Sequence, residues 1–119
     1  MNVIHIETTE QFKKDVLSFD WISVVDFRAE RCGPCRMLGP IMEELAEDNK
    51  GKKVQIVKIN VDQNPELSQT FQVSSIPAVF LMKNGNPVGT IVWANTKSVY
   101  QSKIDALLAE TEEPKKDAE

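Results

Sequence analysis

The sequence has few of the side chains that bind metals and no long apolar run. It contains two cysteines and one histidine, His5, in 119 residues. Structural zinc usually takes four cysteine or histidine ligands, so a metal site is not expected. No apolar stretch approaches the roughly 18 residues of a membrane helix, and residues 1–7 lack the basic start and apolar segment of a signal peptide. These absences predict a soluble, cytoplasmic protein that binds neither metal nor membrane.

An excess of basic charge is also lacking. The chain has 14 lysines and arginines against 18 acidic residues, a net charge of −4. Nucleic-acid-binding proteins usually present a basic face, so this class of partner is not expected. The length and a hydrophobic content of 41% are sufficient for one domain with its own core. We assign residues 1–110 to this domain and residues 111–119, which are mostly charged and contain Pro114, to a flexible C-terminal tail.

Hydrophobic periodicity predicts alternating strands and helices. Strands are expected at residues 3–6, 22–27, 54–61, 78–82 and 87–93, and helices at residues 9–18, 34–49 and 65–71. A last helix is expected after Asn95 or Thr96. Thr8 and Asn64 are expected to cap the helices that follow them, and residues 83–86 have the composition of a hairpin turn. This order predicts an α/β fold in which helices cover both faces of one mixed sheet.

The two cysteines form the motif Cys32-Gly33-Pro34-Cys35 at a predicted junction between strand and helix. Two thiols at this spacing in a reducing compartment are more often catalytic or metal-binding than structural. A helix N-terminus stabilises a thiolate through its dipole and free N–H groups. The pattern favours a reversible dithiol–disulfide site. The alternative is half of a zinc site, for which His5 is the one histidine available.

Asp26 interrupts the apolar strand predicted at residues 22–27. Burial of a carboxylate costs several kcal/mol unless it is paired or protonated. We expect desolvation to raise its pKa, which suits a proton acceptor for Cys35. The alternative is a structurally tolerated acid without a chemical role.

Several segments together resemble the thioredoxin family. Its active-site signature is matched by Val25-Asp26-Phe27, by Ala29-Glu30 and by the cysteine motif. Further matches, over residues 3–109, are Pro40, residues 61–65, Ile76-Pro77 and residues 83–85. The resemblance implies a five-stranded mixed sheet flanked by four helices. It also implies a monomeric protein-disulfide reductase that binds no cofactor and receives electrons from a thioredoxin reductase-type partner, either an NADPH-dependent flavoprotein or a ferredoxin-linked enzyme.

The chemistry of disulfide exchange and the resemblance together suggest roles for individual residues. Cys32 is expected to be the nucleophile and the more buried Cys35 the resolving thiol, with Gly33 and Pro34 shaping the turn between them. The resemblance implies that Lys58 lies near Asp26 on the neighbouring strand; the alternative is a solvated lysine. It also implies that Ile76 precedes a cis proline, Pro77, whose loop lies beside the cysteines and pairs with substrate.

Two arginines stand where the family usually has tryptophan. Arg28 and Arg31, with Arg36 and Glu30, carry a net charge of +2. A nearby cation favours the thiolate, so we expect a lowered pKa of Cys32 and a more oxidising couple. The alternative is that solvent screens exposed arginines and the couple changes little.

Two further departures concern the substrate groove. Trp93 replaces a glycine that the family has beside the cysteines, and Ala78 replaces a common threonine after the cis proline. Trp93 is expected to join Arg28, Arg31 and Ile76 in the groove and to narrow the choice of partners. The alternative is that Trp93 repacks against Trp21.

Reduction of disulfides in target proteins is therefore the leading function. A more oxidising oxidase or isomerase with few partners is a second reading, which the Gly-Pro pair disfavours. A docking subunit without redox activity is a third, and the intact cysteine pair with Asp26 argues against it.

Overall fold

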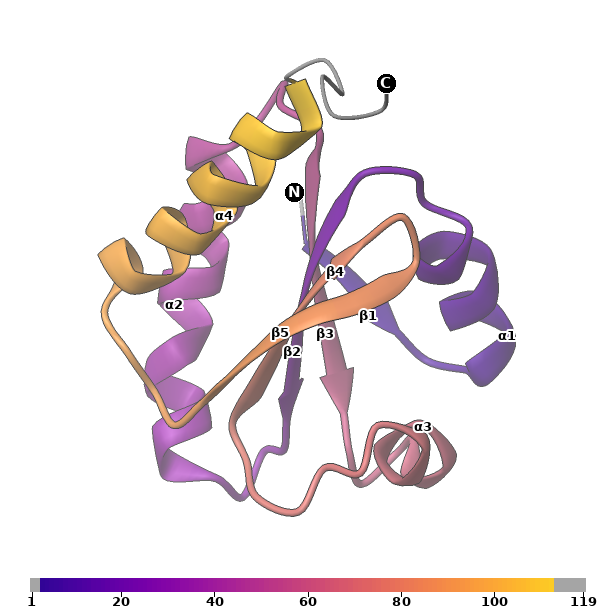
Figure 1. Cartoon of the computed structure of the whole chain (residues 1–119). Helices are drawn as coiled ribbons and strands as arrows, with labels where there is room; N and C mark the ends of the chain where they lie inside the picture. The colour runs from indigo at the N-terminus through magenta and orange to yellow at the C-terminus, as the bar shows by residue number, and fades with distance from the viewer. Residues whose placement is uncertain (1–2, 113–119) are drawn as a thin grey trace.

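The computed structural model describes residues 3–112. Strands and helices follow one another along the chain in the predicted order (Figure 1). The strands are β1 (Val3–Ile6), β2 (Ile22–Arg28), β3 (Val54–Asn60), β4 (Ala78–Lys83) and β5 (Asn86–Val92). The helices are α1 (Thr9–Phe12) with the π-helical turn η1 (Lys13–Leu17), α2 (Gly33–Asp48), α3 (Pro65–Thr70) and α4 (Lys97–Glu112).

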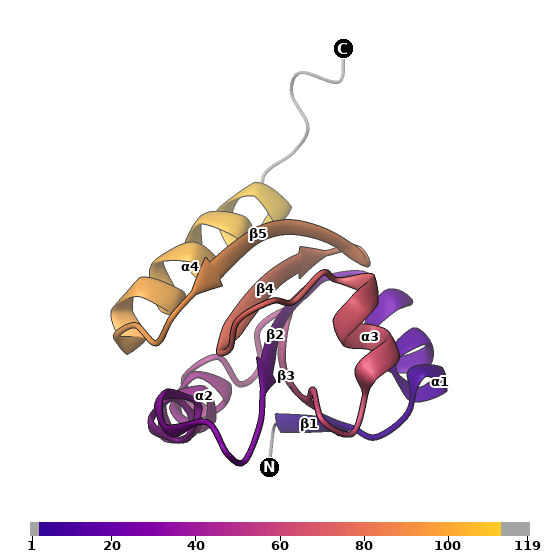
Figure 2. The ribbon, with the colours of Figure 1, turned by 90° about the horizontal axis from the view of Figure 1, so that it is seen from below.

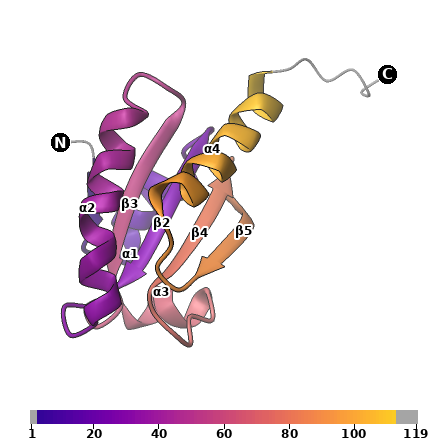
Figure 3. The same ribbon diagram turned by 90° about the vertical axis from the view of Figure 1, so that its left-hand side faces the viewer.

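The five strands form one mixed sheet in the order β1-β3-β2-β4-β5, and Figure 3 shows β3, β2, β4 and β5 in that order. β1, β3 and β2 are parallel, and β4 runs antiparallel to both β2 and β5. The carboxyl end of β2 therefore lies beside the carboxyl end of β3 and the start of β4. The segments that follow β2 and β3 and the one that precedes β4 meet at this end of the sheet.

Helices cover both faces of the sheet, α2 and α4 on one side and α1 and α3 on the other (Figure 2). Alternate residues of β2 enter two separate cores. Ile22 and Val24 pack in the cluster beneath α2 and α4, whereas Val25 and Phe27 pack in the cluster beneath α1 and α3. Burial on both faces explains why this strand reads as a continuous apolar run.

Boundaries differ from the predictions mainly in the first and last helices. The predicted helix at residues 9–18 divides at Phe12 into α1 and the wider turn η1. α4 extends to Glu112, two residues into the predicted tail. The rest of that tail, residues 113–119, lies outside the described residues.

The two predicted caps have different outcomes. Thr8 caps α1 as predicted, since its Oγ1 accepts a hydrogen bond from the Gln11 N–H at 3.0 Å. Asn64 occupies the N-cap position of α3, but its side chain makes no capping bond. Its Nδ2 instead donates to the carbonyl oxygens of Ile6 and Asn60. The prediction of a capping side chain was wrong because these two bonds, to carbonyls of β1 and β3, fix the orientation of the amide.

None of the helices in the described part of the chain has the length and hydropathy of a membrane span.

Candidate active site

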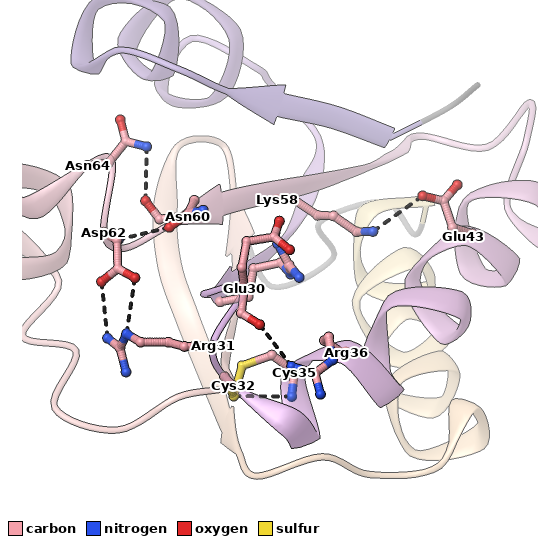
Figure 4. A network of polar contacts seen from close by, with 11 residues as sticks. Glu30, Arg31, Cys32, Cys35, Arg36, Glu43, Lys58, Asn60, Asp62 and Asn64 are labelled. Carbon is pink, nitrogen blue, oxygen red and sulfur yellow. Dashed lines mark hydrogen bonds and ion pairs between the residues drawn. A yellow bond between two sulfur atoms is a disulfide. The ribbon is translucent and has the colours of Figure 1, made fainter.

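The connection between β2 and α2 places both cysteines at the start of a helix (Figure 4). Cys32 is the N-cap residue of α2, and its Sγ accepts a hydrogen bond from the Cys35 N–H at 3.2 Å. A disulfide joins the two residues, whose Cα atoms are 5.2 Å apart. Cys35 is fully buried, whereas Cys32 is partly exposed. Cys32 is therefore the sulfur that a partner can reach.

Gly33 and Pro34 form the first turn of α2. The N–H that Pro34 lacks would have no partner within the helix, so the proline costs no hydrogen bond here. A Cβ on Gly33 would have no atom within 4 Å. The backbone beside the disulfide is thus uncovered, and the free helix N-terminus can stabilise a thiolate on Cys32.

A second loop lies against the cysteines. The peptide bond between Ile76 and Pro77 is cis. Cys32 Sγ lies 3.9 Å from the Ile76 carbonyl oxygen, and the Pro77 carbonyl accepts a hydrogen bond from the Trp93 N–H at 3.1 Å. The segments that carry Cys32, Pro77 and Trp93 meet at one end of the sheet.

Asp26 lies in the middle of β2, on the face covered by α2. Its side chain is completely buried, and neither carboxylate oxygen has a hydrogen-bond partner among the described residues. Burial raises the pKa of Asp26 from 3.8 to about 6, and the nearby charges of Lys58 and Arg28 oppose this rise. The carboxyl group can therefore gain or lose a proton close to neutral pH.

Lys58 is the register partner of Asp26 on β3, so the two side chains emerge on the same face. The Lys58 side chain is 12% exposed, and its Nζ donates to Glu43 Oε2 of α2 at 3.3 Å (Figure 4). The alternative of a solvated lysine is thus wrong. Lys58 therefore pairs with the surface carboxylate of Glu43 and lies beside the buried carboxyl group of Asp26.

The arginines occupy two different environments. Arg28 is mostly buried, at 16% exposure, and its Nη1 lies 3.4 Å from Glu30 Oε2. Arg31 is exposed and binds Asp62 through two hydrogen bonds of 3.0 and 3.1 Å (Figure 4). Inclusion of Asp62 reduces the local charge from the +2 of the sequence count to +1. The hydrogen bond from Arg31 also holds the pKa of Asp62 below its usual value.

This arrangement can be compared with known proteins. A sequence model of the family Thioredoxin matches residues 3–106. The chain belongs to the thioredoxin family. Its fold and its redox-active cysteine pair are those of a thiol-disulfide oxidoreductase, as the sequence predicts.

Relatives in the thioredoxin family cover most of this chain. Thioredoxin 2 of Chlorobaculum tepidum is 42% identical over 102 residues, which are 85% of this chain and 93% of that protein. A thioredoxin of Rickettsia felis is 43% identical over 76% of this chain and 86% of its own. Among solved structures, that of a mutant thioredoxin from Halobacterium salinarum has a TM-score of 0.81 at 28% identity, and 90% and 91% of the two chains are covered.

Trp93 departs from the thioredoxin pattern in its side chain, while its backbone has a conformation that suits the glycine usual in the family. Its φ is 77°, a left-handed value that favours glycine, and its indole is 67% exposed. Trp21 packs on Phe19 and lies at the opposite end of the sheet, where its carbonyl accepts from Asn84. The alternative that the two tryptophans repack together is therefore wrong.

Ala78 is buried in the apolar cluster beneath α1 and α3, and it pairs with Phe27 and Val92. His5 is exposed on the edge strand β1, which β3 separates from β2. Within residues 3–112, histidine, cysteine and acidic side chains nowhere gather in a group of three that could hold a metal ion.

Sequence reasoning missed two acidic partners, Glu43 of Lys58 and Asp62 of Arg31. Asp62 could have been found, because it follows β3 and Arg31 follows β2, and the carboxyl ends of adjacent parallel strands meet at one edge. Glu43 gives no comparable signal, because its pairing depends on how α2 crosses the sheet.

Proposed function

We propose that this chain reduces disulfides in target proteins, with Cys32 as nucleophile and Cys35 as resolving thiol. The observation that carries the proposal is the contrast between the partly exposed Cys32 at the start of α2 and the buried Cys35 behind it. A disulfide exchange needs an exposed thiolate with a second thiol in reach.

The reaction transfers two electrons in two exchanges. The reduced Cys32 thiolate attacks one sulfur of the target disulfide; that bond breaks, and the other target sulfur leaves and takes up a proton. Cys35 then loses its proton, and its thiolate attacks Cys32 Sγ. The mixed disulfide breaks, the second target thiol is released, and the Cys32–Cys35 disulfide forms.

We assign the proton of Cys35 to Asp26. Its pKa of about 6 lets the carboxylate form at neutral pH and accept a proton. Lys58 on the adjacent strand stabilises that carboxylate. The role agrees with the position of Asp26 on the face beneath α2, the helix that carries Cys35.

The docking groove that we propose consists of the Ile76–Pro77 loop, Trp93 and Arg31. Arg28 was also expected in this groove, but we leave it out because its side chain is only 16% exposed. The loop offers backbone groups for pairing with an extended target segment. The exposed indole of Trp93 would restrict the targets to segments that accommodate an aromatic ring. Arg31 contributes less charge than expected, because Asp62 binds it.

We further propose a monomer in the cytoplasm that binds neither membrane nor nucleic acid. It needs no bound cofactor, because the Cys32–Cys35 disulfide itself carries the electrons. A thioredoxin reductase-type enzyme would reduce this disulfide after each cycle. The redox poise would be near that of an ordinary reductase, since Asp62 pairs with Arg31, the arginine that directly precedes Cys32.

The test is reduction of insulin by dithiothreitol with and without the protein. We expect the protein to accelerate the precipitation of the freed insulin B chain severalfold, and the Cys32→Ser variant to lose this effect. If the protein and the variant act alike, the proposed function is wrong.

A further inference from the structure

Arg28 lies next to Asp26 on the same face of β2. Residues two apart on a strand point to one face and are about 7 Å apart. Lys58 flanks Asp26 across the sheet, and Arg28 follows it along its own strand. The carboxyl group therefore has one cation beside it on each of two sides.

The Arg28 side chain is mostly buried, at 16% exposure. It lines an open pocket of about 300 Å³ with residues of β1 and β3, among them His5, Lys58 and Asn60. Glu30, which lies 3.4 Å from Nη1, is 80% exposed and hence well screened. Arg28 Nε is buried, and no group in residues 3–112 accepts its hydrogen bond. The positive charge of Arg28 is therefore little offset by an acidic group on the side that faces the sheet.

Few other charges face Asp26. On β4 its register partner is the apolar Val79. α2 contributes the buried Cys35, together with Glu43 through its bond to Lys58. α4 contributes the hydroxyl of Tyr100. Burial raises the pKa of this hydroxyl, and the charge of Asp26 raises it further. Beyond Lys58, β1 carries the exposed His5. Arg28 and Lys58 are the two cations of this set.

We propose that Arg28 is a positioning residue that acts through Asp26, where it supplements Lys58 and favours the ionised form of the buried carboxyl group. This rests on the proposed role of Asp26 in accepting the proton of Cys35. Arg28 would thereby extend the second exchange step to lower pH, and its contribution would lie in proton transfer rather than in contact with target proteins.

The experiment is a carbon-13 NMR titration of the Asp26 carboxyl group in the oxidised protein. Arg28→Met removes the charge, Arg28→Trp installs the residue usual in the family, and Arg28→Lys keeps the charge. Arg36→Met is the matched control, since Arg36 is an exposed guanidinium of α2 that binds the Glu30 carbonyl. An opposite charge within about 4–6 Å lowers a carboxyl pKa by about 1 to 3 units, and at the roughly 7 Å between these strand positions we expect a smaller shift of about 0.5 to 1 unit.

We expect Arg28→Met and Arg28→Trp to raise the pKa of Asp26 by that amount, and Arg28→Lys and Arg36→Met to leave it near the wild-type value. An unchanged pKa in Arg28→Met and Arg28→Trp would overturn the proposal, as would an equal rise in Arg28→Lys, which would trace the effect to packing.

A second readout separates this inference from the role of Asp26. The rate at which Cys35 resolves a mixed disulfide on Cys32 is followed against pH in the Arg28→Met protein. If the profile moves upward with the pKa of Asp26, both proposals hold. If the pKa moves and the profile does not, Arg28 still acts on Asp26, and the assignment of Asp26 as proton acceptor fails.

Discussion

At the scale of single residues, Asp26 links stability to pH. Its pKa is 3.8 in ordinary surroundings and about 6 in the fold. Because the folded state binds this proton more tightly, the free energy of unfolding falls as pH rises through that interval. The loss is complete above the folded pKa and amounts to about 3 kcal/mol.

Replacement of Asp26 by asparagine should remove this loss. In the oxidised protein we expect Asp26→Asn to raise the free energy of unfolding by roughly 2–3 kcal/mol at pH 8 and by less than about 1 kcal/mol at pH 4. Urea denaturation at both pH values measures the difference. The exposed Asp20 supplies the control variant Asp20→Asn. If Asp26→Asn raises the free energy of unfolding equally at both pH values, ionisation of the buried Asp26 is not the cause.

Trp93 combines an exposed indole with a left-handed backbone. Trp93→Gly and Trp93→Ala both remove the ring, but only glycine relieves the backbone. We expect the glycine variant to be more stable than the alanine variant by about 1 kcal/mol. Both should broaden the range of protein disulfides that are reduced, measured as relative rates on a panel of targets. Unchanged relative rates would show that the indole does not select partners.

The position of a residue could be predicted where it depends on the local sequence. It could not be predicted where it depends on how distant elements pack against one another. The places of Cys32 at a helix start and of Asp26 in a buried strand follow from apolar patterns on either side of the motif. The burial of Arg28 could not be predicted in this way, because the side chain of a residue at the end of a strand can be either exposed or buried.

At the scale of secondary-structure elements, the β4–β5 hairpin is fixed against the first helical segment. Gly85 has a φ of 80°, and a Cβ there would lie 2.3 Å from the Leu17 carbonyl oxygen. The turn residue therefore needs both the backbone freedom and the small size of glycine.

Gly85→Ala should consequently cost more than a positive φ alone. Gly51 has a φ of 84° with no atom within 4 Å of an added Cβ, so Gly51→Ala isolates the backbone cost. We expect that control to lose about 1–2 kcal/mol of unfolding free energy and Gly85→Ala to lose at least about 1 kcal/mol more through the contact with Leu17. Thermal denaturation compares them, and equal losses would contradict the close approach.

The order and type of the elements could be predicted because each has its own hydrophobic period and turn chemistry. The break of the first helix into α1 and η1 could not be predicted, since the sequence at residues 12–13 contains no glycine or proline to mark it. The Asn64 side chain was also unpredictable, because the strand β1 that it binds lies far away in the sequence.

At the scale of the whole molecule, charge pairing sets the expectation for redox poise. Asp62 pairs with Arg31, which directly precedes Cys32, and we assign the effect of Arg28 to Asp26 rather than to Cys32. We therefore expect the equilibrium with glutathione to differ by less than about threefold between wild type and the Arg28→Trp, Arg31→Trp double variant. A tenfold or larger change in this equilibrium constant, equal to about 1.4 kcal/mol, would instead support the more oxidising couple expected from the sequence.

The family and fold were predictable from the sequence because the motifs and the apolar pattern agree over nearly the whole chain. The pairing of distant charges and the opposite placement of Trp21 and Trp93 were not, since they depend on strand order and register. These features decide the surroundings of the cysteines rather than the reaction class.

The most direct test of disulfide exchange at Cys32 is a trapping measurement. The reduced Cys35→Ser and Cys32→Ser proteins are mixed with a small protein disulfide and analysed by mass spectrometry without reducing agent. We predict a stable mixed disulfide on Cys32 in the Cys35→Ser protein and little or none in the Cys32→Ser protein. Trapping mainly through Cys35, or equal trapping by both, would contradict the assignment of Cys32 as nucleophile.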